Sequence, residues 1–198
     1  MEKISKKILF AFLTLSATQV YAADNLLTLG LSEQANQYIK NHRVSLQEAQ
    51  KRLAMQAAKE PLIEQIKNQY KGRLAGIYIE HDPDYKIVVR LKGNQPIQNF
   101  VGKVQSNISL FKNIDLNIPV EFQTGAVETL DEGLSRLKAN IPNLKQLYPD
   151  LQATWYDEKT GEIGLLVYTE GNSNQSSLRQ KLTTLSSKNN GLPFTIEF

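Results

Sequence analysis

Apolar and polar residues alternate in two pairs of short stretches, and a turn-forming sequence separates the members of each pair. The turn is Asp82-Pro83-Asp84 in the first pair and Lys159-Thr160-Gly161 in the second. Alternation with a period of two residues predicts strands with one buried face, and proline, aspartate and glycine favour tight turns. We therefore expect two β-hairpins, with strands at residues 74–80, 85–92, 153–157 and 162–168.

Apolar residues spaced by three or four positions come before each hairpin and predict a helix in front of it. Ser45 and Glu48 form a capping box at the start of the first helix, and Thr129 and Glu132 form another at the start of the second. The two apolar stripes consist of Leu46, Ala49, Leu53, Ala57, Leu62, Ile66 and Tyr70, and of Leu130, Leu134, Leu137, Ile141, Leu144 and Leu147.

Two prolines lie inside these stripes. Proline lacks an N–H group and clashes with the preceding helical turn, so we expect Pro61 to kink or divide the first helix and Pro142 to interrupt the second. Each hairpin should be followed by a shorter helix and a last strand. The helices are expected at residues 97–108 and 176–186, and the strands at 118–122 and 192–198.

The two halves of the chain repeat the same order of elements. Residues 77–93 align without a gap with residues 155–171, at an offset of 78 (155 − 77). This predicts an α+β fold built as a tandem duplication of an α-β-β-α-β unit, over residues 45–125 and 126–198. Each unit should be a three-stranded antiparallel sheet with its helices on one face and its other face open to solvent or to a partner. Units this small are expected to pack together.

The N-terminal residues have the composition of a secretory signal peptide. Three lysines in the first seven residues precede an apolar run, and Val20-Tyr21-Ala22 fits a cleavage site. We expect cleavage of residues 1–22 after Ala22 and a polar, partly helical lead-in over residues 23–44. The product should lie in the periplasm or outside the cell. The alternative is that the N-terminal residues form a buried helix.

Charge and composition narrow the classes of partner. Loss of residues 1–22 takes the basic count from 23 to 20 and the acidic count from 20 to 19, so the net charge becomes about +1. This balance argues against a nucleic-acid partner. No stretch of the mature chain is apolar and long enough to predict an integral membrane segment. The chain has no cysteine, which excludes a thiolate zinc site.

The two histidines are the first candidates for chemistry. His81 lies among Glu80, Asp82 and Asp84, so a metal or acid–base site is one reading and a solvated turn is the preferred one. His42 lies at a polar helix end, and no serine lies in a G-x-S-x-G context. We therefore expect a protein that is not an enzyme, with no catalytic residue, metal or cofactor.

Aromatic residues gather on and beside the hairpins, where they serve either recognition or ordinary strand packing. The group consists of Tyr78, Tyr85, Trp155, Tyr156 and Tyr168. Trp155 is predicted to be a core residue. Alternation puts Tyr156 on the strand face opposite Trp155 and Asp157. The sequence does not decide whether that face is buried or exposed at Tyr156.

The hairpin sequences also carry a resemblance to a family. Residues 75–89, Ala-Gly-Ile-Tyr-Ile-Glu-His-Asp-Pro-Asp-Tyr-Lys-Ile-Val-Val, resemble a segment of the pro-regions of secreted bacterial trypsin-like serine proteases. Residues 154–163 resemble the aromatic, acidic hairpin in the second half of these pro-regions, which are of the alpha-lytic protease and streptogrisin type. The resemblance covers about residues 45–198 and consists of structural rather than catalytic motifs.

The resemblance implies a folding helper and inhibitor of a secreted serine protease of trypsin-like fold. In this family the second unit continues its sheet into the protease by strand pairing, and the segment after the last strand lies in the active site. We expect no protease domain and no such segment after Phe198, so action would be in trans. Partner-binding residues are expected to be Tyr156, Tyr168, Thr195, Ile196, Glu197 and Phe198. The alternative is a periplasmic or surface interaction module that uses the same fold without a protease partner.

Overall fold

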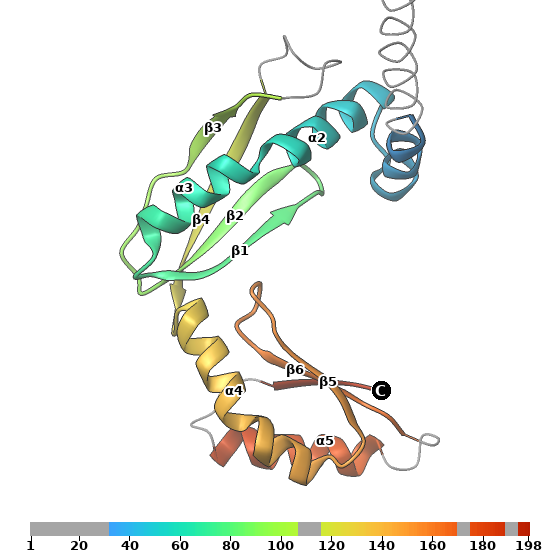
Figure 1. Cartoon of the computed structure of the whole chain (residues 1–198), viewed down its shortest axis with the longest axis vertical. Helices are drawn as coiled ribbons and strands as arrows, with labels where there is room; N and C mark the ends of the chain where they lie inside the picture. Colours follow the sequence, from blue (N-terminus) through green and yellow to red (C-terminus); the bar gives the residue numbers. More distant parts are fainter. Residues whose placement is uncertain (1–31, 107–115, 170–174, 189–193) are drawn as a thin grey trace, which may run out of the picture. The chain divides into compact units, whose positions relative to one another are not determined.

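The computed structural model describes residues 32–106, 116–169, 175–188 and 194–198 (Figure 1). The predicted signal peptide lies outside the described residues. The chain divides into two compact units. The first consists of Met1–Glu60 and Lys103–Asn117, and the second of Pro61–Gly102 and Ile118–Phe198.

The first unit contains a helix over residues 32–42 and helix α2 (Leu46–Ala58). Ser45 caps α2 as predicted, because its hydroxyl accepts a hydrogen bond from the Glu48 N–H at 3.1 Å. The Glu48 carboxylate in turn accepts from Nε of Arg52 at 2.6 Å. These described helices share a small apolar core of Ala35, Tyr38 and Ala49, with Ile39, Val44 and Leu53 packed against it.

Pro61 divides the predicted first helix, as expected. Helix α2 ends at Ala58, Lys59 is not helical, and α3 (Glu60–Tyr70) begins directly afterwards. Proline is compatible with the first turn of a helix, where backbone N–H groups have no partner within the helix. The sequence therefore uses Pro61 at the start of a new helix rather than inside the old one.

The first sheet has four strands in the order β1-β2-β4-β3. Its strands are β1 (Leu74–Glu80), β2 (Lys86–Lys92), β3 (Phe100–Val104) and β4 (Leu116–Ala126). The β1–β2 hairpin is antiparallel, as predicted, but β4 pairs with β2 in parallel. The prediction of a three-stranded antiparallel sheet is therefore wrong. A parallel neighbour needs a crossover connection, and the chain between β2 and β4 provides one that includes β3.

The helix predicted over residues 97–108 is also wrong, because residues 100–104 form β3. The apolar residues have helical spacing, but Phe100, Val101 and Val104 are residue types that favour strands. Gly102 disfavours a helix interior, and its bare backbone lets the Leu62 side chain approach so closely that an added Cβ would overlap it.

The second sheet has three strands in the order β5-β6-β7, namely β5 (Leu151–Tyr156), β6 (Ile163–Val167) and β7 (Phe194–Glu197). Strands β5 and β6 form the second predicted hairpin and are antiparallel, whereas β6 and β7 are parallel. This sheet is therefore mixed as well, contrary to the antiparallel prediction. The physical reason is again a crossover connection, here through α5 (Gln175–Lys188).

Helix α4 (Leu130–Leu147) begins with the complete capping box that the sequence predicts. The Thr129 hydroxyl accepts from the Glu132 N–H at 3.2 Å, and the Glu132 carboxylate accepts from the Thr129 N–H at 2.7 Å. The predicted interruption at Pro142 is wrong, since α4 continues through it. The fully buried Leu144 and Tyr148 anchor the last turn beyond it, which offsets the lost N–H bond and the steric clash that proline introduces.

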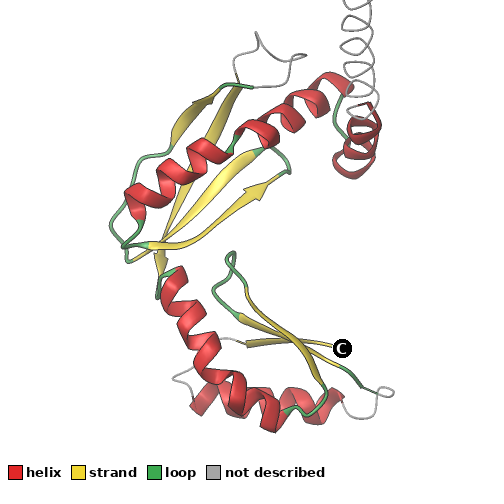
Figure 2. Cartoon of the chain, viewed as in Figure 1, coloured by secondary structure: helices red, strands yellow, loops and turns green. Residues whose placement is uncertain are grey.

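Helices α4 and α5 lie on the same face of the second sheet (Figure 2). The core between them and the strands consists of Leu144, Tyr148, Ile163, Leu165, Val167, Leu182 and Ile196. The protein is thus a mixed α+β structure with sheets of four and three strands. Within the described ranges, no helix is both long and apolar enough to cross a membrane.

Candidate functional site

The second sheet has an outer face, which we define as the face opposite α4 and α5. The strand residues of the core alternate with the residues of this face. Gly164 of β6 pairs with Trp155 of β5 on one side and with Thr195 of β7 on the other. In the same way, Leu166 of β6 pairs with Ala153 and with Glu197. The outer face therefore consists of Ala153, Trp155, Gly164, Leu166, Thr195 and Glu197.

The indole of Trp155 lies directly on the backbone of Gly164. A Cβ atom added to Gly164 would come closer than 3.0 Å to three atoms of the indole, so this position requires glycine. Trp155 is half-buried and lies on the outer face rather than in the core between sheet and helices, which corrects the predicted core position. With Leu166, which is 36% exposed, it gives the outer face an apolar centre.

Strand β7 is an edge of the second sheet. It pairs with β6 on one side, and no described strand pairs with its other side. Thr195 and Glu197 are exposed, while Ile196 between them is buried in the core. An edge strand presents unpaired N–H and C=O groups, which can receive a strand of another protein.

The remaining partner residues predicted from the sequence occupy different places. Tyr168 is 58% exposed just beyond β6, and its N–H donates to the Asp150 carbonyl at 3.0 Å. Phe198 packs its ring against the core and lies 5.0 Å from the Arg179 guanidinium. Its side chain is thus held by its own fold. The structure brings Thr195 and Glu197 together at one edge of the sheet.

Tyr156 lies away from that edge, at the end of β5 where the β5–β6 turn begins. It is half-buried and its ring covers Gly133, where an added Cβ would overlap the phenol ring. Burial raises the pKa of the Tyr156 hydroxyl, and the nearby Glu128 carboxylate adds to this effect. The phenol is therefore a neutral packing group at physiological pH.

The β5–β6 turn makes polar contacts with the first hairpin that the sequence did not predict. The Arg90 guanidinium donates to the carbonyl oxygens of Glu158 at 2.9 Å and Thr160 at 3.2 Å. The Ile77 N–H donates to the Glu158 carboxylate at 2.9 Å. A Cβ added to Gly76 would overlap the Glu158 carbonyl. Glycine inside a strand often marks such a close approach, so Gly76 was the available signal.

Further ion pairs surround this contact. Arg136 of α4 forms a two-pronged ion pair with Glu128 and donates to the Gly161 carbonyl at 3.2 Å. Lys92 of β2 pairs with Glu132 of α4 at 2.7 Å. The face of the first hairpin that was expected to be open is therefore partly covered by the β5–β6 turn and tied to the start of α4.

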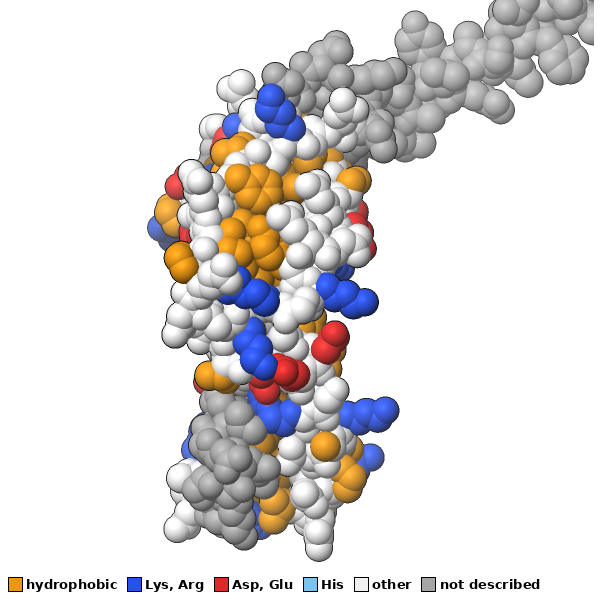
Figure 3. All heavy atoms as spheres, turned by 90° about the vertical axis from the view of Figure 1, so that its left-hand side faces the viewer, with side chains coloured by type: hydrophobic (Ala, Val, Ile, Leu, Met, Phe, Trp, Pro, Cys, Tyr) orange, Lys and Arg blue, Asp and Glu red, His pale blue; other side chains and the backbone are white. Residues whose placement is uncertain are grey.

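A second surface with apolar character lies on β3. Phe100 and Val101 are both exposed, although neighbouring strand residues point to opposite faces. Phe100 lies beside Phe122, which packs edge-on against Tyr70. Figure 3 shows the side of the molecule on which Figure 1 places β3, and hydrophobic side chains gather there in one patch.

No group of three or more His, Cys, Asp or Glu residues in the described part of the chain is arranged to hold a metal ion. His81 lies against the Tyr85 ring at a centroid distance of 5.5 Å. No protein-family model matches the chain, and no curated protein matches it significantly. The residues themselves therefore carry the functional argument.

Proposed function

We propose that this protein is an exported, non-enzymatic binding protein of the serine protease pro-region type. It acts in trans on a secreted protease of trypsin-like fold, as a folding helper or inhibitor. The observation that carries the proposal is the edge strand β7, whose outer side has no described partner strand and whose Thr195 and Glu197 side chains are exposed. Main-chain hydrogen bonds along such an edge provide affinity, and alternate side chains provide selectivity.

Strand register supports the tandem duplication that belongs to this proposal. Val88 of β2 pairs with Glu121 of β4, and Leu166 of β6 pairs with Glu197 of β7. Leu166 is the residue that the repeat alignment matches to Val88, at an offset of 78 (166 − 88), and Glu197 is matched to Glu121 at 76 (197 − 121). Equivalent residues of the two halves are thus paired in the same parallel register.

The outer face supplies the selective part of the proposed contact. A strand added beside β7 would place its side chains next to Thr195 and Glu197, with Leu166 and Trp155 one and two strands further on. Because Glu197 is acidic and exposed, it favours a partner strand with a basic residue opposite it. Trp155 and Leu166 add apolar contact area, which main-chain hydrogen bonds between strands do not provide.

The test mixes the mature protein with chymotrypsin-like proteases, including any that are encoded beside it. Complex formation, protease activity and refolding yield of the denatured protease are measured. Thr195→Lys should weaken the complex, since lysine on an edge strand discourages pairing. Gln152→Lys, at an exposed site of the opposite edge strand β5, is the matched control. Absence of any complex and of any change in activity or refolding would rule the proposal out.

The exposed β3 surface favours one alternative, a periplasmic or surface interaction module without a protease partner. Phe100 and Val101 present apolar area to solvent on a strand at the end of the sheet order. In that case an envelope protein, and no protease, should be captured by the wild-type chain. Val101→Asp should abolish the capture, whereas Thr195→Lys should leave it unchanged.

A further inference from the structure

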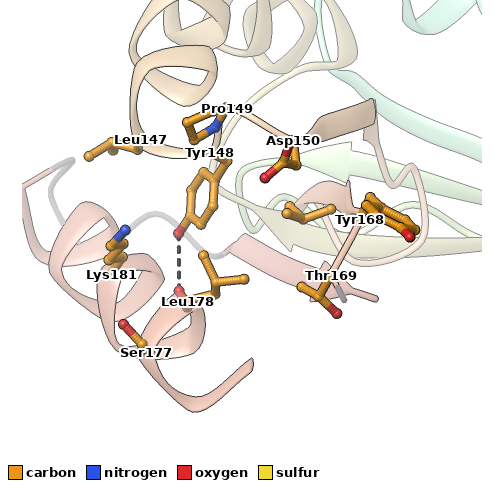
Figure 4. A pocket seen from close by; sticks show the side chains of 10 residues that line it. Leu147, Tyr148, Pro149, Asp150, Tyr168, Thr169, Ser177, Leu178 and Lys181 are labelled. Atoms are coloured by element: carbon orange, nitrogen blue, oxygen red, sulfur yellow. Dashed lines mark hydrogen bonds between the residues drawn. The ribbon is translucent and has the colours of Figure 1, made fainter. Parts of the chain in front are cut away.

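The helical side of the second sheet contains a cavity of about 480 Å³ (Figure 4). It lies between the end of α4, the start of α5 and the end of β6. Its volume falls in the range of small-molecule sites, about 300–1,000 Å³. The residues that line it include Tyr148, Asp150, Tyr168, Ser177, Leu178 and Lys181.

The floor of this cavity is fixed by a hydrogen bond. Tyr148 is fully buried, and its hydroxyl donates to the Leu178 carbonyl of α5 at 3.2 Å, as the dashed line in Figure 4 marks. Burial raises the pKa of the Tyr148 hydroxyl, so the phenol stays neutral and keeps this bond. The bond joins the end of α4 to α5, and the cavity is therefore preformed rather than assembled by a ligand.

Opposite charges lie on opposite sides of this floor. Figure 4 shows Asp150 on one side of Tyr148 and Lys181 on the other. Both side chains are exposed, and neither forms an ion pair with any residue in the described ranges. Asp150 follows the negative end of the α4 dipole, whereas Lys181 lies in the second turn of α5, beyond the turn over which that helix's dipole acts. The end of α4 therefore adds to the negative potential around Asp150.

We propose that this cavity binds a zwitterionic ligand, a free amino acid or short peptide. The ligand's ammonium group faces Asp150, and its carboxylate faces Lys181 and the Ser177 hydroxyl. Its apolar side chain lies on Leu178, which is half-buried. Two charges of opposite sign lie at the two sides of one preformed cavity, and neither is paired within the part of the chain that the structure describes, so the cavity fits a ligand that carries both charges. This site is separate from the β7 edge and does not rest on the proposed protease partner.

The experiment titrates the full mature protein with the dipeptide Gly-Leu, with its N-acetyl form and with its C-terminal amide. Binding is followed by calorimetry and by amide chemical shifts in NMR. The free dipeptide should bind most tightly and shift the amides of Asp150, Ser177, Leu178 and Lys181. Removing either ligand charge should weaken binding up to about five-fold, the effect of one exposed charge pair.

Variants assign each charge to its partner. Asp150→Asn should weaken binding of Gly-Leu but not of the N-acetyl form, and Lys181→Met should weaken Gly-Leu but not the amide. Asp131→Asn and Lys138→Met change exposed charges elsewhere on α4 and should have no effect. Circular dichroism checks that each variant is folded. No shift at the cavity residues at millimolar Gly-Leu, equal binding of all three ligands, or equal behaviour of site and control variants would overturn the proposal.

Discussion

The Nη1 atom of Arg90 lies 2.9 Å from the backbone carbonyl oxygen of Glu158 and donates a hydrogen bond to it. Arg90 is on β2, near the open end of the first hairpin, and Glu158 is in the turn of the second, 68 residues apart along the chain. A guanidinium has several donors in a rigid fork, which lets the same side chain reach the Thr160 carbonyl as well. One side chain therefore holds a turn from a distant part of the sequence.

Replacing Arg90 should destabilise the protein. Arg90→Met removes both bonds to the turn carbonyls, and hydrogen bonds from charged donors contribute about 1.5–3 kcal/mol each, an upper bound here since Arg90 is only half-buried. Urea unfolding measures the loss. Arg90→Lys keeps the charge but not the fork, so it should recover only part of the stability. Unchanged stability of Arg90→Met would show that the turn contact contributes nothing.

Gly76→Ala should be destabilising as well, because its methyl group would overlap the Glu158 backbone carbonyl. Overpacking of this kind costs about 1–3 kcal/mol. Gly72→Ala is the matched control, since no atom lies within 4 Å of its added Cβ and it has no positive φ. Thermal unfolding should separate the two variants clearly. Equal melting temperatures for both variants would contradict the close approach.

Gly164→Ala should displace the Trp155 indole. The added methyl group would overlap the indole, and Trp155 is the only tryptophan in the chain, so its fluorescence reports this one position. We expect a shift of the emission maximum toward that of an exposed indole, together with lower stability. An emission spectrum identical to that of the wild-type protein would contradict the packing of Trp155 on Gly164.

Lys86 creates a pH dependence on the first sheet. It pairs with Glu121 at 2.7 Å and Glu80 at 2.9 Å. The hydrogen bond from Lys86 lowers the pKa of Glu121 below its ordinary value of 4.5. A carboxylate with a lowered folded-state pKa stabilises the protein above its unfolded-state pKa, and this contribution is lost as pH falls through the folded-state value.

Glu121→Gln should therefore lower the free energy of unfolding at neutral pH, and this loss should become smaller as pH falls below 4.5. Urea unfolding of both proteins across this range measures the difference. In a Lys86→Met background the same substitution should lose most of its pH dependence, because the cause of the pKa shift is gone. A difference that stays constant with pH would contradict the role of Lys86.

Local features of this fold were predictable from the sequence. The two hairpins depend on alternation and on turn residues, and the cap at Thr129 depends on two residues three positions apart. Helix α3 begins at Glu60 because Pro61 restricts the backbone locally. In each case the deciding interactions connect residues that are close along the chain.

Features decided by distant contacts were not predictable. Strand β3 has helical spacing of apolar residues but residue types that favour a strand, and its pairing beside β4 decides between the two. The gapless repeat alignment also fails at the second hairpin, where Trp155 pairs with Gly164 although transfer of the first hairpin's register would pair it with Val167. The last strand was predicted to bind a partner through Thr195, Ile196, Glu197 and Phe198 together, but strand alternation buries Ile196 in the core and leaves Thr195 and Glu197 exposed.

The Glu158 carboxylate also covers part of the edge of strand β1. It accepts the hydrogen bond of an Ile77 N–H that points away from β2, which is the place where a strand from another molecule would bind to β1. The protein thus shields this part of its first hairpin from intermolecular sheet growth with a side chain from its own second hairpin. Under the proposed function, in which β7 offers its edge to a partner, this protection is an advantage, since each additional open edge raises the risk of aggregation.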